Sequence, residues 1–189
     1  MKYINQLQLR HVPYETNVLH GGRPPESRNI ATNGCGICST CMMVELLTDK
    51  ELPIEECVQL SYDTVANHKP GTDLDRLSPA VAERFDLDYL PTDDLDEVID
   101  ALRCGGKVII HVQKGLFTAG GHYMLLVSYD GEDFCILDPS YKPTKFATPE
   151  REGRVDESHV PFLYYNARLM HEEETSDKYT KYHIFRRKK

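Results

Sequence analysis

Hydrophobic residues run almost without interruption through residues 36–48, where Glu45 is the only charged residue. Drawn as an α-helix, this segment is apolar on every side. A helix without a polar face has to be covered by several neighbouring elements. The pattern therefore predicts a central, buried helix that begins close to Cys35 and ends near Leu47.

Two further segments, on either side of residue 70, have helical character. A weaker helix is expected after Pro53. From Thr72 onward, apolar residues recur at helical spacing, but Ser78-Pro79 predicts a fresh start, with Ser78 as the cap and Pro79 in the first turn. An interrupted helix is therefore expected in this part of the chain.

The clearest amphipathic pattern follows Thr92, which is expected to cap a helix that ends at Gly105-Gly106. Its apolar face consists of residues at positions i, i+3, i+4 and i+7: Leu95, Val98, Ile99 and Leu102. The next segment, 107–112, is typical of a buried strand.

Two strand patterns come next, one that begins with His122 and one that ends with Asp138, with Asp130-Gly131 between them. Asp-Gly favours a tight turn, because glycine accepts the positive φ that such turns require. If the turn consists of residues 129–131, His122 lies directly opposite Asp138 and the two side chains share a face. A turn one residue longer or shorter would place them on opposite faces.

Predicted helices precede predicted antiparallel strands along the chain, which is typical of the α+β class. Residues 9–32 are rich in proline, glycine and asparagine and are expected to be irregular, with short strands near 9–12. Residues 141–181 carry much of the polar surface, and a last β-like segment lies at 182–185. We expect one domain, residues 1–189, in which the central helix packs against an antiparallel sheet and its N-terminus meets the sheet at a cleft.

Composition narrows the set of partners. The chain has 189 residues and a formal net charge of −8, which argues against a nucleic acid as the main partner although residues 186–189 are all basic. No segment approaches the ~18 apolar residues of a membrane span, and the N-terminus lacks the apolar core of a signal peptide. The sequence thus predicts a cytoplasmic protein that binds neither nucleic acids nor membranes, and it leaves the oligomeric state open.

The candidate chemistry starts at Cys35, which lies between Gly34 and Gly36 at the start of the central helix. Unpaired backbone N–H groups and the helix dipole stabilise a thiolate at such a position and lower the thiol pKa. His122 supplies a candidate base, and Asp138 a partner for that histidine. A cysteine, a histidine and an aspartate in this order predict a thiol hydrolase with a catalytic triad.

A competing interpretation comes from Cys35, Cys38 and Cys41, a C-x2-C-x2-C run similar to part of an iron–sulfur or zinc ligand set. No fourth cysteine lies nearby, and on a regular helix the three side chains point in directions that drift by about 60° per step. We therefore interpret Cys38, Cys41 and the remaining cysteines other than Cys35 as structural residues. No metal or cofactor is expected, since the histidines show no metal-ligand spacing such as H-E-x-x-H.

Four short motifs follow one another along the chain: Val12-Pro13-Tyr14, Asn33-Gly34-Cys35-Gly36, Gly121-His122-Tyr123 and Leu137-Asp138-Pro139. Together they resemble the bacteriocin-leader-type, or double-glycine, cysteine peptidases of the papain-like superfamily, over roughly residues 10–140. The resemblance implies a papain-like fold and a peptide or small amide as substrate. It also implies that Cys35 is the nucleophile, His122 the general base and acid, and Asp138 the group that orients His122.

That family usually carries a glutamine upstream of the cysteine, and the glutamine amide helps to form the oxyanion hole. This chain has Asn17 where the glutamine is expected, and a second asparagine, Asn29, six residues before Cys35. The resemblance thus implies Asn17 as the first candidate for the oxyanion hole and leaves Asn29 open. After Gly36, the residues Ile37 to Cys41 replace the small polar run that is usual in the family.

Cysteine acyl chemistry proceeds through a thioester, which water hydrolyses or an amine intercepts. The sequence therefore predicts a peptidase or other amidohydrolase, with an acyltransferase or transglutaminase-like enzyme as an alternative. A second alternative is a papain-like module that holds a peptide without cutting it. In either case the glycine-containing loop 115–121, just before His122, is expected to close over a ligand.

Overall fold

The structure, a computed structural model, describes residues 2–188. Its helices are α1 (Ile30–Asn33), α2 (Cys35–Thr48), α3 (Ile54–Asp63), α4 (Leu74–Phe85), α5 (Leu95–Arg103) and α6 (Ala167–Leu169), which a π-helical turn (Met170–Glu174) follows. Short 3-10 helices occupy Gln6–Gln8, Val18–His20 and Pro25–Ser27. The strands are β1 (Leu87–Thr92), β2 (Lys107–Val112), β3 (His122–Tyr129), β4 (Asp133–Leu137), β5 (Asp156–His159), β6 (Phe162–Asn166) and β7 (Tyr182–Arg187).

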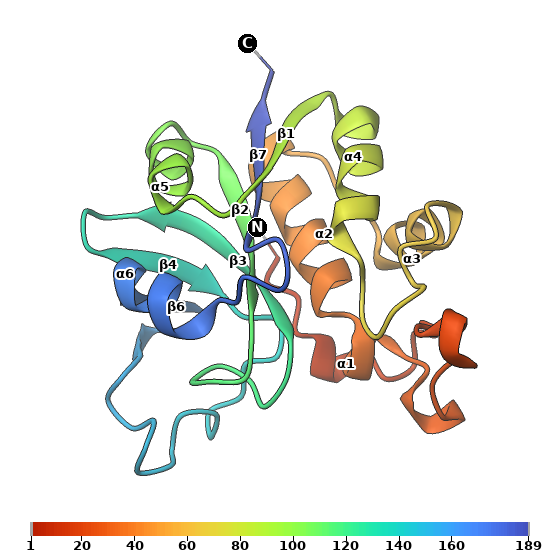
Figure 1. Cartoon of the computed structure of the whole chain (residues 1–189), viewed down its shortest axis with the longest axis horizontal. Helices are drawn as coiled ribbons and strands as arrows, with labels where there is room; N and C mark the ends of the chain where they lie inside the picture. Colours follow the sequence, from red (N-terminus) through yellow and green to blue (C-terminus); the bar gives the residue numbers. More distant parts are fainter. Residues whose placement is uncertain (1, 189) are drawn as a thin grey trace.

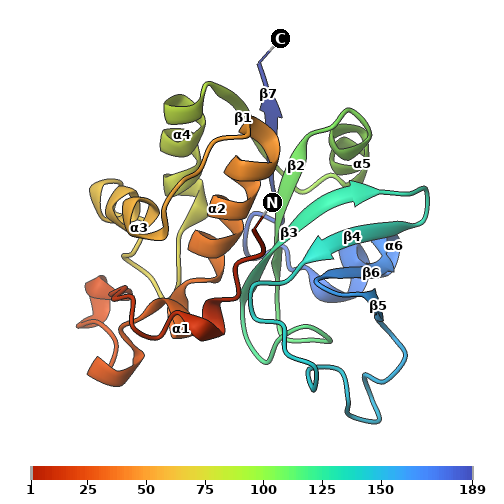
Figure 2. The ribbon, with the colours of Figure 1, turned by 180° about the vertical axis from the view of Figure 1, so that it is seen from behind.

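The described strands form one antiparallel sheet in the order β1-β7-β2-β3-β4-β6-β5, and helices cover both of its faces (Figure 1). Alternate residues of the central strands divide between two cores, because successive side chains of a strand point to opposite faces. Ile109 and Leu125 join the core beneath α2, α3 and α4, whereas Val108 and Met124 join the core beneath α5. The reverse view shows the same division, with α2, α3 and α4 to one side of the sheet and α5 and α6 to the other (Figure 2). The predicted α+β class is confirmed.

Helix α2 is buried on every side, as its composition predicts. Its buried residues are Gly36, Ile37, Cys38, Ser39, Thr40, Cys41, Met42, Met43, Val44 and Leu47. The helix packs along β3, and Ser39 Oγ donates a hydrogen bond to the carbonyl of Tyr123 at 3.4 Å. This packing holds the N-terminal end of α2 against the start of β3. Among residues 2–188, no helix has both the length and the apolar character that crossing a bilayer requires.

Helix α4 is continuous, so the predicted interruption at Ser78-Pro79 is wrong. Asp73 caps the helix and Pro79 lies inside it. A proline in this position removes one backbone hydrogen bond. Buried apolar residues on both sides of Pro79 pack into the same core and hold the helix together: Leu74, Leu77 and Val81.

The cap of α5 also differs from the prediction. Asp94 caps the helix, and its side chain accepts a hydrogen bond from the Asp96 N–H at 2.8 Å. Thr92 instead ends β1, and its hydroxyl accepts a hydrogen bond from the Asp94 N–H at 3.0 Å. The pairing of β1 with β7 extends the strand through Thr92, which moves the start of the helix beyond it.

The β3–β4 hairpin has a different register from the predicted one. Leu125 pairs with Leu137, two residues further along β4 than predicted, and a β-bulge interrupts the ladder at Val127. His122 and Asp138 are therefore not directly opposed. Because the shift near Leu125 is an even number of residues, it keeps both side chains on one face. They become diagonal neighbours, a separation that an imidazole and a carboxylate can span.

Three strands lie where the sequence pattern predicts none. β1 precedes α5, and β5 and β6 lie within 141–181, the segment interpreted as polar surface. Near residues 9–12 the structure has no strand among the described residues, only an isolated bridge between Pro13 and Asn29. The strand patterns at 107–112 and 182–185 are confirmed as β2 and β7.

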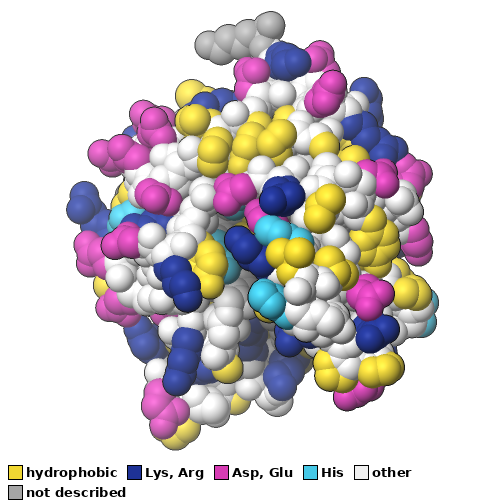
Figure 3. All heavy atoms as spheres, turned by 45° about the vertical axis from the view of Figure 1, so that its right-hand side comes forward, with side chains coloured by type: hydrophobic (Ala, Val, Ile, Leu, Met, Phe, Trp, Pro, Cys, Tyr) yellow, Lys and Arg dark blue, Asp and Glu magenta, His cyan; other side chains and the backbone are white. Residues whose placement is uncertain are grey.

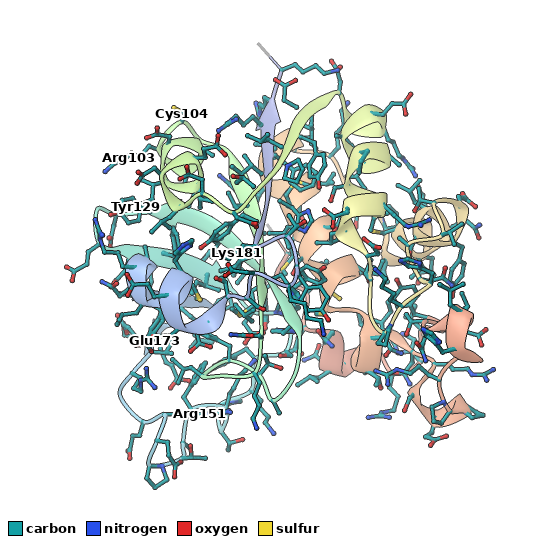
Figure 4. The ribbon with its side chains drawn as sticks, viewed as in Figure 1. Arg103, Cys104, Tyr129, Arg151, Glu173 and Lys181 are labelled. Atoms are coloured by element: carbon teal, nitrogen blue, oxygen red, sulfur yellow. The ribbon has the colours of Figure 1, made fainter. Side chains whose placement is uncertain are left out.

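Cys104 is exposed, so its interpretation as a structural core residue is wrong. It directly follows α5, at the outer end of that helix, and the guanidinium of Arg103 beside it lies 5.4 Å from the centre of the Tyr129 ring (Figure 4). The other cysteines that were interpreted as structural are buried: Cys38, Cys41, Cys57 and Cys135.

Candidate active site

Cys35 is the first residue of α2 and lines a cavity of about 410 Å³. Its side chain is partly exposed. The first backbone N–H groups of a helix have no intrahelical partner, so the N–H of Cys35 is a candidate donor to a ligand. Histidine, acidic and basic side chains lie close together around a hollow in the middle of one face of the molecule (Figure 3). The cavity is lined by residues from the helical side and from the sheet, as the predicted cleft requires.

His122, the first residue of β3, is in contact with Asp138, which directly follows β4. His122 Nε2 lies 2.8 Å from Asp138 Oδ1, and both side chains are buried. His122 and Cys35 line the same cavity, and each shifts the pKa of the other. Because Asp138 engages Nε2, the nitrogen available to Cys35 is Nδ1. The structure thus brings together the three residues that the sequence singled out.

Besides the hydrogen bond with His122, Asp138 accepts hydrogen bonds from several further residues. Its Oδ1 accepts from the N–H and the hydroxyl of Ser140, at 2.8 and 3.1 Å. Its Oδ2 accepts from the ammonium of Lys145, which is buried and also donates to Ser140 Oγ at 2.8 Å. The Tyr3 hydroxyl donates to the backbone carbonyl of Asp138 at 2.5 Å. A buried carboxylate needs such donors to remain charged.

Sequence reasoning did not single out Ser140, Lys145 or Tyr3. The run Asp138-Pro139-Ser140 carries a usable signal, because aspartate side chains often accept hydrogen bonds from the backbone two residues on. Lys145 carries none, since a lysine in a polar segment is normally a surface residue. Only the folded chain brings its ammonium to Asp138.

The charges in the site favour a thiolate beside an imidazolium. Burial alone raises the pKa of Cys35, but the hydrogen bond and positive charge of His122 and two backbone N–H groups outweigh burial and lower that pKa. Burial lowers the pKa of His122, yet the charge and hydrogen bond of Asp138, together with Cys35, raise it to about 9. Burial raises the pKa of Asp138, but His122 and Lys145 hold it well below its usual range. A low thiol pKa beside a high imidazole pKa is the condition for an ion pair near neutral pH.

The asparagines considered for the oxyanion hole lie in different places. Asn17 has a left-handed backbone conformation, its N–H donates to the carbonyl of Lys69 at 2.9 Å, and it is not among the residues that line the cavity. Asn29 caps α1, where its side chain accepts a hydrogen bond from the Thr32 N–H. The asparagine that lines the cavity is Asn33, two residues before Cys35.

A second histidine, His111 of β2, lines the same cavity but has a different electrostatic character. Burial, together with the charge of His122, lowers its pKa to about 4, so its ring is neutral near pH 7. The ring packs against Tyr123, with 4.7 Å between ring centres. Across the cavity, the Thr180 hydroxyl hydrogen-bonds to the carboxylate of Asp75 at 3.0 and 3.1 Å. This bond links the start of α4 to the segment before β7.

The loop before His122 is anchored at its first half. Leu116 and Phe117 are buried, and the Leu116 N–H donates to the carboxylate of Glu174 at 2.9 Å. Residues 119–121 are exposed. Closure of this loop over a ligand stays a prediction, and the anchoring restricts it to the second half of the loop.

Replacing Gly34 by alanine is expected to destabilise the fold by about 1–3 kcal/mol. The added Cβ would lie 2.6 Å from Ile30 Cγ2 and 2.7 Å from the Ile30 carbonyl oxygen, in the turn that joins α1 to α2. The resulting strain should also displace Cys35 and slow its alkylation. Urea unfolding measures the first effect, and the rate of reaction with iodoacetamide measures the second.

Gly120→Ala is the matched control for this substitution, because a Cβ there would meet no atom within 4 Å. It should change the free energy of unfolding by less than about 0.5 kcal/mol. Equal stability of the two variants would contradict the close packing at Gly34.

The model of the family described as Peptidase_C39 like matches residues 1–152. A crystal structure from Bacillus anthracis, provisionally described as that of a C39-like peptidase, aligns with 99% of this chain and 94% of its own chain, with a TM-score of 0.59 and 13% sequence identity. At this identity the structural match concerns the fold alone. A search of curated proteins found no match.

Proposed function

The chain belongs to the Peptidase_C39 like family, and from this premise we propose that it is a cysteine peptidase or related amidohydrolase with a papain-like arrangement of its site. The observation that carries the proposal is the position of the His122 ring, which lies 2.8 Å from Asp138 and lines the same cavity as Cys35, whose pKa it lowers. Cys35 is the nucleophile, His122 the general base and acid, and Asp138 the residue that orients His122. The substrate is a peptide or a small amide.

In the resting site the thiol proton resides on His122. The Cys35 thiolate attacks the substrate carbonyl carbon, and the electron pair of the C=O bond moves onto oxygen. When this intermediate collapses, the C–N bond breaks, His122 gives its proton to the departing nitrogen, and a thioester remains. Water, losing a proton to His122, then attacks the thioester, the C–S bond breaks, and the carboxylic acid leaves. An amine in place of water would give acyl transfer.

We propose the backbone N–H of Cys35 as one donor to the oxyanion, because it lies at the positive end of the α2 dipole. Asn17 lies away from the cavity, and the Asn29 amide already donates to the carbonyl of Glu26 at 2.9 Å. The Asn33 amide also donates to a backbone carbonyl, that of Ser27, but Asn33, unlike Asn29, lines the cavity, and its second N–H is the group proposed as the other donor.

The pH dependence of Cys35 alkylation by iodoacetamide tests the proposal, with each cysteine followed by mass spectrometry. We expect a transition well below the reference thiol pKa of ~8.5. Cys104, an exposed thiol at the end of α5, serves as the internal reference. Alkylation of Cys35 no faster than that of Cys104 at pH 6 would overturn the proposed nucleophile.

A screen of peptide and amide mixtures for turnover separates the enzyme from the alternative of a silent binding module. Hydrolysis that is lost in Cys35→Ala supports the enzyme. A rapidly alkylated Cys35 together with peptide binding, but without turnover, would instead identify a module that binds without cutting.

Replacing Lys145 by methionine is expected to raise the pKa of His122 by on the order of one unit. The ammonium of Lys145 lies buried on the far oxygen of Asp138 and carries the same charge as the imidazolium, so its removal favours protonated His122. NMR titration of the His122 ring measures the shift. Lys145→Arg keeps the charge and should move the pKa much less. A His122 pKa that is the same in both variants and the wild type would show that the Lys145 charge does not reach the ring.

A further inference from the structure

Cys38 has no part in the proposed hydrolysis, yet it completes a Cys35-Gly36-Ile37-Cys38 motif with the nucleophile. Both cysteines lie in the first turn of α2. Residues three apart in an α-helix have Cα atoms about 5 Å apart, and a disulfide requires about 4.4–6.8 Å. The backbone of α2 thus holds the two cysteines within disulfide range.

The two thiols have opposite environments. Cys35 is partly exposed, and His122 lowers its pKa against the effect of burial. Cys38 is fully buried, and burial, with the negative charge of Cys35, raises its pKa. An accessible, low-pKa cysteine at a helix N-terminus, followed three residues later by a second cysteine, is the arrangement in which C-x-x-C pairs react with oxidants and disulfides.

The buried cysteines deeper in α2 are less suited to pair with Cys35. Cys41 lies almost two turns along the helix, and the thiol that acts most strongly on its pKa is that of Cys57. Cys38 lies between these thiols and the site, and the charge of Cys35 is the largest one acting on it. Cys38 is therefore the thiol that can reach an oxidised Cys35.

A disulfide between Cys35 and Cys38 requires a small adjustment of the first turn of α2. Helical neighbours have Cβ atoms about 5–6 Å apart, whereas a disulfide needs about 3.5–4.5 Å, so the first turn must tighten by roughly 1 Å. Cys35 makes no intrahelical bond through its own N–H, since it opens the helix. Gly34 packs closely against Ile30, and Gly36 against Thr72 and Tyr123, so the adjustment has to come from the turn at Cys35 itself.

We propose that Cys35 and Cys38 form a reversible modification site, in which a hydroperoxide oxidises Cys35 and Cys38 captures the product as an intramolecular disulfide. The inference rests on the proposed function, because it uses the same Cys35 thiolate, but it requires no substrate. The disulfide removes the nucleophile from His122 and protects it from irreversible oxidation.

The Cys35 thiolate attacks the terminal oxygen of the hydroperoxide, the O–O bond breaks, an alcohol leaves after taking up one proton, and a sulfenic acid remains. The Cys38 thiol then attacks the sulfenic sulfur, its proton joins the departing hydroxyl, and water leaves as the S–S bond forms. The two thiols lose two electrons in total, which the hydroperoxide accepts. A dithiol reductant reverses the reaction by thiol–disulfide exchange.

Wild type, Cys38→Ser and Cys135→Ser are treated with a small excess of hydrogen peroxide, and the free thiols are then alkylated in denaturant and mapped by mass spectrometry. In the wild type we expect the segment that contains Cys35 and Cys38 to lose two hydrogen atoms, with Cys41 in the same segment still alkylated. Dithiothreitol should restore nearly all of the Cys35 alkylation. Cys135→Ser, which removes another buried thiol, should behave like the wild type.

In Cys38→Ser, peroxide should drive Cys35 to sulfinic acid, and recovery with dithiothreitol should fall at least about tenfold, while alkylation without peroxide is unchanged. Sulfinic acid in wild type and Cys38→Ser alike, with normal Cys35 alkylation, would overturn this inference alone. A Cys35 that neither iodoacetamide nor peroxide modifies would overturn the proposed function as well. If Cys38→Ser does not fold, the presence or absence of the Cys35–Cys38 link in the wild type decides.

Discussion

Replacing His122 by alanine is expected to abolish hydrolysis and to remove the reactivity of Cys35 on the acid side of pH 8. The loss in kcat should be on the order of 10⁴–10⁶-fold, since residues that act together in such a site lose most of their effect when one is removed. Without the hydrogen bond and charge of His122, burial raises the pKa of Cys35. Each unit of that rise lowers the rate of alkylation at pH 6 about tenfold. Iodoacetamide kinetics between pH 5 and 10 measure the effect without a known substrate.

His122→Ala should also change how the free energy of unfolding depends on pH. The pKa of His122 is about 9 in the folded protein, above the unfolded value of about 6.5, so its protonation stabilises the folded state. That contribution is fully present below about pH 6.5 and is lost as the pH rises through about 9. The difference in the free energy of unfolding between wild type and His122→Ala should therefore shrink across this window.

His111→Gln is the matched control, because His111 lines the same cavity and its ring is neutral near pH 7. The Cys35 alkylation profile should keep its position in this variant. If His111→Gln shifted the profile as His122→Ala does, the role of base would have been assigned to the wrong histidine.

Replacing Asp138 by asparagine is expected to lower the free energy of unfolding by about 3–5 kcal/mol near pH 7, because it leaves the buried ammonium of Lys145 without its counter-charge. Hydrolysis should fall by about 10⁴-fold, since an amide can hold His122 in the wrong tautomer. Chemical unfolding at several pH values measures the first effect. Asp100→Asn, which changes an exposed aspartate of α5, is the control and should cost less than about 0.5 kcal/mol.

The cost of Asp138→Asn should depend on pH with a defined sign. The pKa of Asp138 lies below its usual value of about 3.9, so the charged carboxylate stabilises the folded state. This contribution is present above about pH 3.9 and is lost as the pH falls toward the folded-state pKa. The stability difference should therefore decrease in solutions more acidic than about pH 4, and it should also shrink above about pH 6.5, where the protonation of His122 that Asp138 supports is lost. A difference that does not change with pH would show that the carboxylate contributes by its shape and not by its charge.

The central helix and the position of Cys35 follow from local sequence, which explains why they could be predicted. An uninterrupted apolar segment has to be buried, and the glycines around Cys35 mark the start of that segment. The sequence also predicted that His122 and Asp138 share a face of the sheet, but it did so from a hairpin register that differs from the observed one. The predicted register was wrong, but the even shift beside Leu125 preserved the face.

The remaining parts of the site depend on contacts between distant segments. The bulge at Val127 has no glycine or other local signal, and it lies between the pairs Leu126–Ile136 and Ser128–Cys135 of the β3–β4 ladder. Strand β6 does carry a local signal, the aromatic and apolar residues 162–165, but it is short and lies within a polar stretch, and its pairing with β4 joins segments that are remote along the chain. Lys145 reaches Asp138 from that same stretch. Propensity and periodicity do not describe such pairings, because the partner residues are remote along the chain.

The proposed nucleophile and its partners arrive from opposite layers of the molecule, Cys35 from a helix and His122 and Asp138 from strand ends (Figure 1). Hydrogen bonds such as that between Thr180 and Asp75 join the two layers near the cavity. A separation of the layers by about an ångström would leave every helix and strand intact and still break the contact that activates the thiol. The reactivity of Cys35 therefore reports whether the helical layer and the sheet are packed together. In mild denaturant, a partial separation of the two layers should lower the rate of Cys35 alkylation before circular dichroism detects any loss of secondary structure.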